Sequence, residues 1–113
     1  MYIKFKSKRL KKQCETYSEA CKAWGPERAR KVIQRLNEIK AAPTLRDLGH
    51  LPPARCHALT GDYKGRYAVN LTHNYRLIFE PIVGSGEAQV SGPLQLSQVR
   101  EVRILEVIDY HGD

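Results

Sequence analysis

The stretch HALTGDYKGRYAVNLTHNYRLIFE, residues 57–80, decides the fold of this chain. Residues 66–71 and 75–80 predict two strands, and the short connection between them at residues 72–74 is typical of a hairpin. Just before the hairpin, residues 56–59 predict a short strand, and the glycines at 61 and 65 predict a turn. The second half of the chain is therefore expected to form a sheet.

Two further strands follow from the segments that flank this stretch. Residues 2–6 alternate and predict a short strand near the N-terminus. Residues 102–108 are apolar on both faces, which suits a strand in the interior of a sheet. Residues 84–97 are rich in Gly, Ser and Gln, and we expect a mobile loop there, longer than a hairpin connection needs.

The first half of the chain carries helical periodicity instead. Ser7 can cap a helix that runs to Gly25, with an inner face formed by Leu10, Cys14, Tyr17 and Cys21. A second helix begins at Pro26 or Glu27, and its apolar stripe is Ala29, Val32, Ile33, Leu36 and Ile39. Residues 44–47 predict a capped single turn. The order of elements predicts a single α+β domain over residues 1–113, with two N-terminal helices on a mostly antiparallel sheet of four to five strands.

Charge is distributed unevenly along the chain. The net charge is +7, and residues 1–66 hold sixteen Lys and Arg against six Asp and Glu, whereas residues 67–113 hold three against six. Such a basic surface is typical of proteins that bind nucleic acid, because each neutralised phosphate releases counterions. A solvated face or a docking face for an acidic protein remains an alternative. The first twelve residues contain six cations: Lys4, Lys6, Lys8, Arg9, Lys11 and Lys12.

Composition excludes several classes of protein. An odd count of three cysteines argues against a disulfide framework, and Cys14 and Cys21, seven apart on one expected helix, lie too far apart to bond. No spacing of Cys, His or acidic residues is typical of a metal site, so we expect no metal. No apolar run approaches the length of a membrane span or a signal peptide, so we expect a cytoplasmic protein without cofactors.

Five residues carry groups that can act on a phosphodiester. Cleavage of RNA without a metal needs a base for the 2′-hydroxyl, an acid for the leaving 5′-oxygen and positive charge on the phosphate. Histidine suits the proton transfers and arginine suits the phosphate. Taken singly, each residue also has a structural interpretation, as a half-buried strand residue, a solvated side chain or part of a terminal tail. The candidates are His57, Arg76, Asp109, Tyr110 and His111.

Together these residues resemble a known family. The run His-x-Leu-x-Gly-Asp-x-x-Gly from His57, the strand Asn-Tyr-Arg ending at Arg76 and the terminal Asp-Tyr-His at 109–111 are similar to the HigB-type killer toxins. That family belongs to the RelE superfamily of bacterial toxin–antitoxin systems. The resemblance covers most of the chain, because the N-terminal strand and helices match in order and length. It implies a compact microbial-RNase fold.

The resemblance also implies a function. Members of the family are endoribonucleases that enter the ribosomal A site and cleave mRNA there without a metal or cofactor, inhibiting translation. It implies as partners the 70S ribosome and a small helix-turn-helix antitoxin, HigA-like. Matched by position, all five candidates above fall on the family's catalytic residues. The RNA-binding residues expected are Lys4, Lys6, Lys8, Arg9, Lys11, Lys12, Lys64 and Arg66.

Two departures and two rival interpretations remain. Residues 84–97 are longer than the family's connection, and Thr60 stands where lysine is common. One rival is a non-catalytic member of the same fold that binds RNA or a partner. The other is a DNA-binding regulator that uses the basic outer face of the second helix, although the strand-rich remainder suits no helix-turn-helix module. That outer face is formed by Arg28, Arg30, Lys31 and Arg35.

Overall fold

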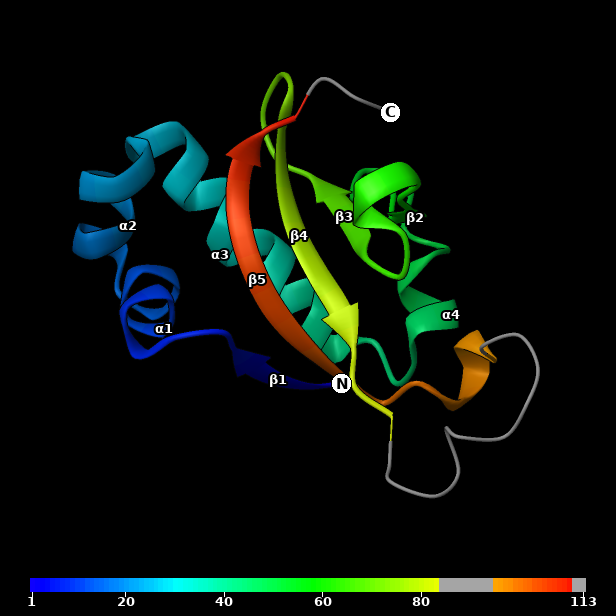
Figure 1. The fold of residues 1–113 in the computed structure, drawn as a ribbon. Helices are drawn as coiled ribbons and strands as arrows, with labels where there is room; N and C mark the ends of the chain where they lie inside the picture. The colour runs from blue at the N-terminus through cyan, green and yellow to red at the C-terminus, as the bar shows by residue number, and fades with distance from the viewer. Residues whose placement is uncertain (84–94, 111–113) are drawn as a thin grey trace.

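A computed structural model describes residues 1–83 and 95–110, and its centre is one twisted sheet. The strands lie in the order β1-β5-β4-β3-β2 (Figure 1). β1 runs parallel to β5, and every other neighbouring pair is antiparallel. The strand bounds are β1 (Tyr2–Phe5), β2 (His57–Ala58), β3 (Tyr67–Asn70), β4 (Tyr75–Pro81) and β5 (Glu101–Asp109). The predicted hairpin and the interior position of the last strand are confirmed.

The helices cover one face of this sheet. Their bounds are α1 (Lys8–Glu15), α2 (Tyr17–Trp24), α3 (Pro26–Ala41) and α4 (Leu45–Leu48), and short 3₁₀ turns occupy Gly61–Tyr63 (η1) and Leu96–Gln98 (η2). Figure 1 shows α3 passing behind β4 and β5. Apolar residues of α3 join the core that includes Leu77 and Phe79 of β4 and Val102 and Ile104 of β5. This α+β architecture agrees with the prediction from the sequence.

The first helix differs from the prediction, because it is broken in two. Thr16 is extended, with φ −116° and ψ 118°, and its N–H still closes the last turn of α1 on the carbonyl of Lys12. The helix then restarts with a rotated face. Tyr17 is consequently 46% exposed, and Ala20 is the buried residue of α2. The apolar spacing across residues 10–21 predicted one continuous helix. The extended backbone of Thr16 instead ends α1, and α2 starts after it. Ser7 does cap α1, accepting from the N–H of Leu10 at 3.1 Å.

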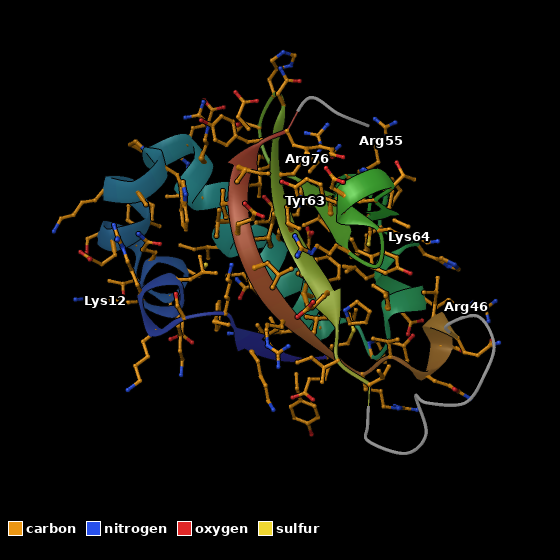
Figure 2. The ribbon with its side chains drawn as sticks, viewed as in Figure 1. Lys12, Arg46, Arg55, Tyr63, Lys64 and Arg76 are labelled. Atoms are coloured by element: carbon orange, nitrogen blue, oxygen red, sulfur yellow. The ribbon has the colours of Figure 1, made fainter. Side chains whose placement is uncertain are left out.

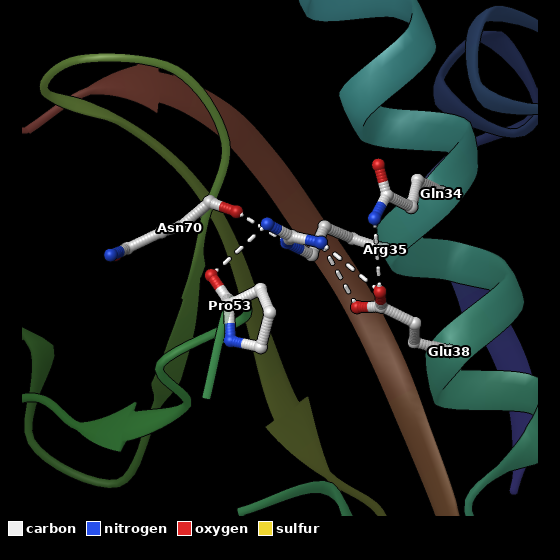
Figure 3. A network of polar contacts seen from close by, with 5 residues as sticks. All are labelled: Gln34, Arg35, Glu38, Pro53 and Asn70. Atoms are coloured by element: carbon white, nitrogen blue, oxygen red, sulfur yellow. Dashed lines mark hydrogen bonds and ion pairs between the residues drawn. The ribbon is translucent and has the colours of Figure 1, made fainter. Parts of the chain in front are cut away.

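The stripe of α3 is confirmed with one exchange. Ile33 is only half-buried, whereas Arg35, expected on the solvent side, is 3% exposed. Its guanidinium donates from Nε to the Asn70 carbonyl at 2.6 Å and from Nη2 to the Pro53 carbonyl at 3.0 Å, and it pairs with Glu38 at 3.1 Å (Figure 3). Arg35 therefore joins α3 to the end of β3 and to the loop before β2.

The predicted helix cap at residues 44–47 and the predicted free thiols are confirmed. Thr44 and Asp47 form the predicted capping box at the start of α4. All three cysteines are free thiols, although the single helix assumed for two of them is wrong. Of the expected loop at 84–97, residues 84–94 lie outside the described residues, and η2 begins within the rest. Within residues 1–83 and 95–110, no helix is long and apolar enough to cross a membrane.

Candidate active site

The register of the sheet places two of the predicted catalytic residues on one face. Ala68 and Ile78 pack on the face that turns away from the helices, and His57 is the cross-strand partner of Ala68. Arg76 lies two residues from Ile78 on β4, so its side chain leaves the same face, since side chains alternate along a strand. We call this the site face. His57 and Arg76 stand two strand spacings apart across the sheet and two residues apart along it, so their Cα atoms are about 12 Å apart.

The backbone before β2 sets the tautomer of His57. Its Nδ1 lies 2.8 Å from the carbonyl oxygen of Arg55. A carbonyl only accepts, so Nδ1 is the protonated nitrogen and Nε2 carries the lone pair of the neutral ring. Arg55 has a left-handed backbone, with φ 46°, which non-glycine residues rarely adopt. The loop therefore takes a costly conformation that turns a carbonyl toward this ring.

Arg76 is anchored at one corner of its guanidinium. Nη1 donates to the carbonyl of Tyr75 at 3.1 Å. Nε is buried and bonds to no atom of the residues that the structure describes. Beside it, the Arg28 guanidinium lies 3.8 Å from the centre of the Tyr75 ring, on the helix side of β4. Arg76 thus keeps a donor available on the site face while its backbone is held by packing behind.

Tyr110 is fixed against the same face. Its N–H donates to the carbonyl of Asn74 at 2.7 Å, at the tip of the β3–β4 hairpin, where Asn74 has φ 60°. The ring is 9% exposed and meets the ring of Tyr63 edge-on, with centroids 5.5 Å apart. It joins a small cluster with Leu59 and Ile78. The hairpin tip and the site-face cluster therefore hold Tyr110 in place.

The other two candidates are placed differently. Asp109 is exposed and is the cross-strand partner of Tyr75, so alternation directs its side chain to the helix side of the sheet rather than to the site face. His111 lies outside the described residues. Register therefore brings His57, Arg76 and Tyr110 together and leaves Asp109 at the rim.

The expected RNA-binding residues fall into two groups. Lys64 and Arg66 adjoin η1, and the Arg66 guanidinium lies 5.5 Å from the centre of the Tyr63 ring. The six cations of residues 4–12 are exposed on β1, α1 and the link between them. Figure 2 shows Lys12 on the opposite side of β5 from Tyr63 and Lys64. A pocket of about 300 Å³ lies beside this N-terminal group, lined by Ile3, Lys4, Phe5, Ser7, Lys8 and Lys11.

Sequence reasoning missed several residues around the site. Figure 2 shows Arg46 and Arg55 to the right of β4 in this view, as Lys64 is, and both are exposed. Tyr63 supports Tyr110, and Asn70 is the cross-strand partner of Arg76. Only the register of β3 against β4 identifies Asn70, and isolated arginines in loops carry no signal of their own.

Two further groups bear on the chemistry. Burial raises the pKa of the Cys56 thiol, next to His57, to about 12, so this residue stays protonated and does not act as a nucleophile near neutral pH. Among the described residues, no group of three or more His, Cys, Asp or Glu side chains gathers as metal ligands would.

Comparison with known proteins identifies the chain's relatives. The profile of a family described as the RelE-like toxin of type II toxin–antitoxin system HigB matches residues 3–90, a span that includes His57 and Arg76 but not Tyr110. A search of curated proteins gave no significant match. A chain of the YoeB-YefM complex from Staphylococcus aureus shares the fold, with a TM-score of 0.55, 14% identity and 99% and 98% of the two chains covered. The YoeB/ParE toxin from Agrobacterium tumefaciens has a TM-score of 0.53 and 13% identity, and covers 99% of this chain and 100% of its own.

Proposed function

The chain belongs to the HigB-like family of RelE-like toxins of type II toxin–antitoxin systems, and from this premise we propose that it is a metal-independent endoribonuclease. The proposed substrate is mRNA in the ribosomal A site, and its cleavage would stop translation in the cytoplasm. The observation that carries the proposal is the shared face of His57 and Arg76, with the tautomer of His57 set by the Arg55 carbonyl.

Arg76 and His57 divide the chemistry in this proposal. Arg76 holds the scissile phosphate, because a guanidinium donates in a planar fork and stabilises the charge that grows in the transition state. His57 presents the lone pair of Nε2, so in its neutral form it takes the proton of the attacking 2′-hydroxyl. If His57 is instead the protonated partner, it supplies the proton to the leaving 5′-oxygen, so it performs one of the two transfers. The product ends would be 2′,3′-cyclic phosphate or 3′-phosphate.

The C-terminal residues complete the site. We assign His111 the proton transfer that His57 does not perform, and Asp109 the orientation of the base from the rim of the sheet. Tyr110 is 9% exposed, with its ring against Tyr63, which favours a positioning role over stacking with its open face on a base. Tyr63 and Arg66 offer the more accessible aromatic and cationic surface for a nucleotide.

The exposed cations of residues 4–12 then bind ribosomal RNA, and Lys64 and Arg66 bind the message. Holding the substrate on the ribosome supplies proximity that a small site cannot provide by itself. We further propose that a HigA-like antitoxin neutralises the chain. The antitoxin complex of the Staphylococcus aureus structural neighbour is consistent with such a partner.

The test is induction of the chain in bacteria, with growth and mRNA 5′ ends followed together. We expect growth arrest and new cuts within messages, and we expect Arg76→Ala to lose at least about a hundredfold in cleavage. Arg76→Lys keeps the charge without the fork and should lose about tenfold. Arg100→Ala is the matched control, because Arg100 is exposed and contributes its backbone carbonyl alone to the sheet.

The outcomes separate the rival interpretations. Cleavage by purified chain on ribosomes that persists in EDTA supports the mechanism, whereas a requirement for a divalent cation refutes it. Toxicity that survives both Arg76→Ala and His111→Ala favours a binding protein of the same fold.

A further inference from the structure

Several polar atoms on the site face are buried and unbonded, and they lie close together in the sheet. They are Asn70 Oδ1 and Arg76 Nε, with Thr72 Oγ1 at the start of the following turn, and none of them bonds to an atom of residues 1–83 or 95–110. Asn70 and Arg76 are cross-strand partners, so their Cβ atoms lie about 5 Å apart. Nearly all buried polar atoms in proteins are bonded, and a neighbouring acceptor and donor without partners point to a ligand.

The fold holds Asn70 without using its Oδ1. The backbone N–H of Asn70 donates to the Ala54 carbonyl at 2.7 Å, and its carbonyl accepts from Arg35 Nε at 2.6 Å, as Figure 3 shows. Both bonds are made by main-chain atoms of Asn70, so they remain when its side chain is replaced. The backbone of Asn70 is therefore fixed by contacts that do not involve its side-chain amide, which suits a residue that meets substrate.

The chemistry of the two atoms selects the group that they bind. Arg76 Nε donates and suits a phosphate oxygen, whereas Asn70 Oδ1 only accepts and needs a donor. In an RNA strand the donor nearest to a phosphate is the ribose 2′-hydroxyl, and DNA has none. We propose that Asn70 accepts a hydrogen bond from the 2′-hydroxyl of a nucleotide flanking the phosphate that Arg76 binds, a hydroxyl other than the attacking one, and thereby selects ribose over deoxyribose. This inference rests on the proposed function for its choice of phosphate.

The test measures binding apart from cleavage. Chains carrying His57→Ala, which prevents cleavage, are titrated at low salt with three labelled 12-nucleotide strands of one sequence: ribose, 2′-fluoro and 2′-deoxy. Fluorine occupies the place of the hydroxyl but cannot donate a hydrogen bond. We expect the ribose strand to bind about threefold to tenfold more tightly than the other two, the range that one hydrogen bond supplies.

The variants assign the preference to one atom. Adding Asn70→Ala should make the three strands bind equally, and Asn70→Asp should weaken all of them, because a carboxylate pairs with Arg76 and repels phosphate. Asn37→Ala, at an exposed position on α3, should keep the preference. Thermal unfolding of Asn70→Ala should match that of its parent, since the main-chain bonds remain.

Each outcome decides the inference. A ribose preference that Asn70→Ala leaves intact overturns it, as does equal or undetectable binding of the three strands by the parent. If the preference depends on Asn70 and yet the unmodified chain cuts no mRNA, Asn70 is a ribose contact and the proposed nuclease function fails instead.

Discussion

The cations at the two ends of this molecule differ in their exposure to solvent. In the β1–α1 region all six Lys and Arg side chains of residues 4–12 are exposed. At the β3–β4 end, Arg35 is buried beside the last residue of β3, and Arg76 is half-buried with one nitrogen on a backbone carbonyl. Exposed cations are therefore dense where we propose a binding surface, and the cations that the fold immobilises lie beside the proposed catalytic site. Substitutions at the two ends should have different effects.

The largest effect is expected at Arg35. Replacement by methionine leaves the carbonyls of Asn70 and Pro53 without their donor and removes the ion pair with Glu38, and the loss should lower the free energy of unfolding by about 3–5 kcal/mol. Urea unfolding measures the change. Asn37→Met, at an exposed position of the same helix, is the control and should cost little. Equal unfolding midpoints for the two variants would contradict the assigned role.

Tyr110 should show the next largest effect. Tyr110→Ala removes a ring that packs on Tyr63 and Ile78 and should cost roughly 3 kcal/mol, as large-to-small core substitutions do. Tyr110→Phe keeps the ring and should stay within about 0.5 kcal/mol of the parent. Activity lost in Tyr110→Phe at unchanged stability would assign a role to the hydroxyl. A stable Tyr110→Ala chain would show that the C-terminal segment is not held as described.

The exposed lysines should act on binding and leave folding unchanged. Lys8→Ala with Lys11→Ala should weaken binding to ribosomes severalfold at low salt and reduce the slope of log affinity against log salt by about two. The pair Lys22→Ala and Lys40→Ala removes the same charge from α2 and α3 and serves as the control. If both pairs have the same effect, general charge rather than the β1–α1 surface determines binding.

Cys56 gives the smallest effect and a pH dependence. Burial raises its pKa from 9.0 to about 12, so between these pH values the unfolded chain loses a proton that the folded chain retains. The unfolded state then binds fewer protons, and stability falls as pH rises, by up to about 1.4 kcal/mol per pH unit for this thiol. Comparing the chain with Cys56→Ala between pH 8.5 and 10.5 isolates this contribution from other titrations. Parallel curves for the two proteins would contradict the burial of the thiol.

Much of the fold could be predicted from local pattern. The hairpin at 67–81, the interior strand at 101–109 and the stripe of α3 each follow from periodicity within one segment. The break at Thr16 could not be predicted in this way, because the apolar residues on both sides of it keep the spacing of one continuous helix. Arg35 was placed on the wrong side because its partners are main-chain carbonyls 18 and 35 residues away, and composition does not reveal them.

The choice of site residues stays a prediction from residue type, and their geometry could not be predicted. His57 and Arg76 were proposed from their chemistry and from the family resemblance, and the register places them on one face. The side of Asp109 and the neighbour of Arg76 depend on which residue of one strand lies opposite which residue of the next. Register is a property of pairs of segments. The local sequence around Asn70 therefore does not show that this residue lies opposite Arg76.

The position of β5 in the sheet also determines when the chain can complete its fold during synthesis. β1 is made first and β5 last among the strands, yet β1 pairs with β5 alone. A nascent chain that already contains His57 and Arg76 must therefore wait for residues 101–109 before its first strand can dock and Tyr110 can close the site face. Because β1 pairs only with β5, the sheet cannot be completed on the ribosome until residues 101–109 have left the exit tunnel. The complete fold therefore forms late in synthesis.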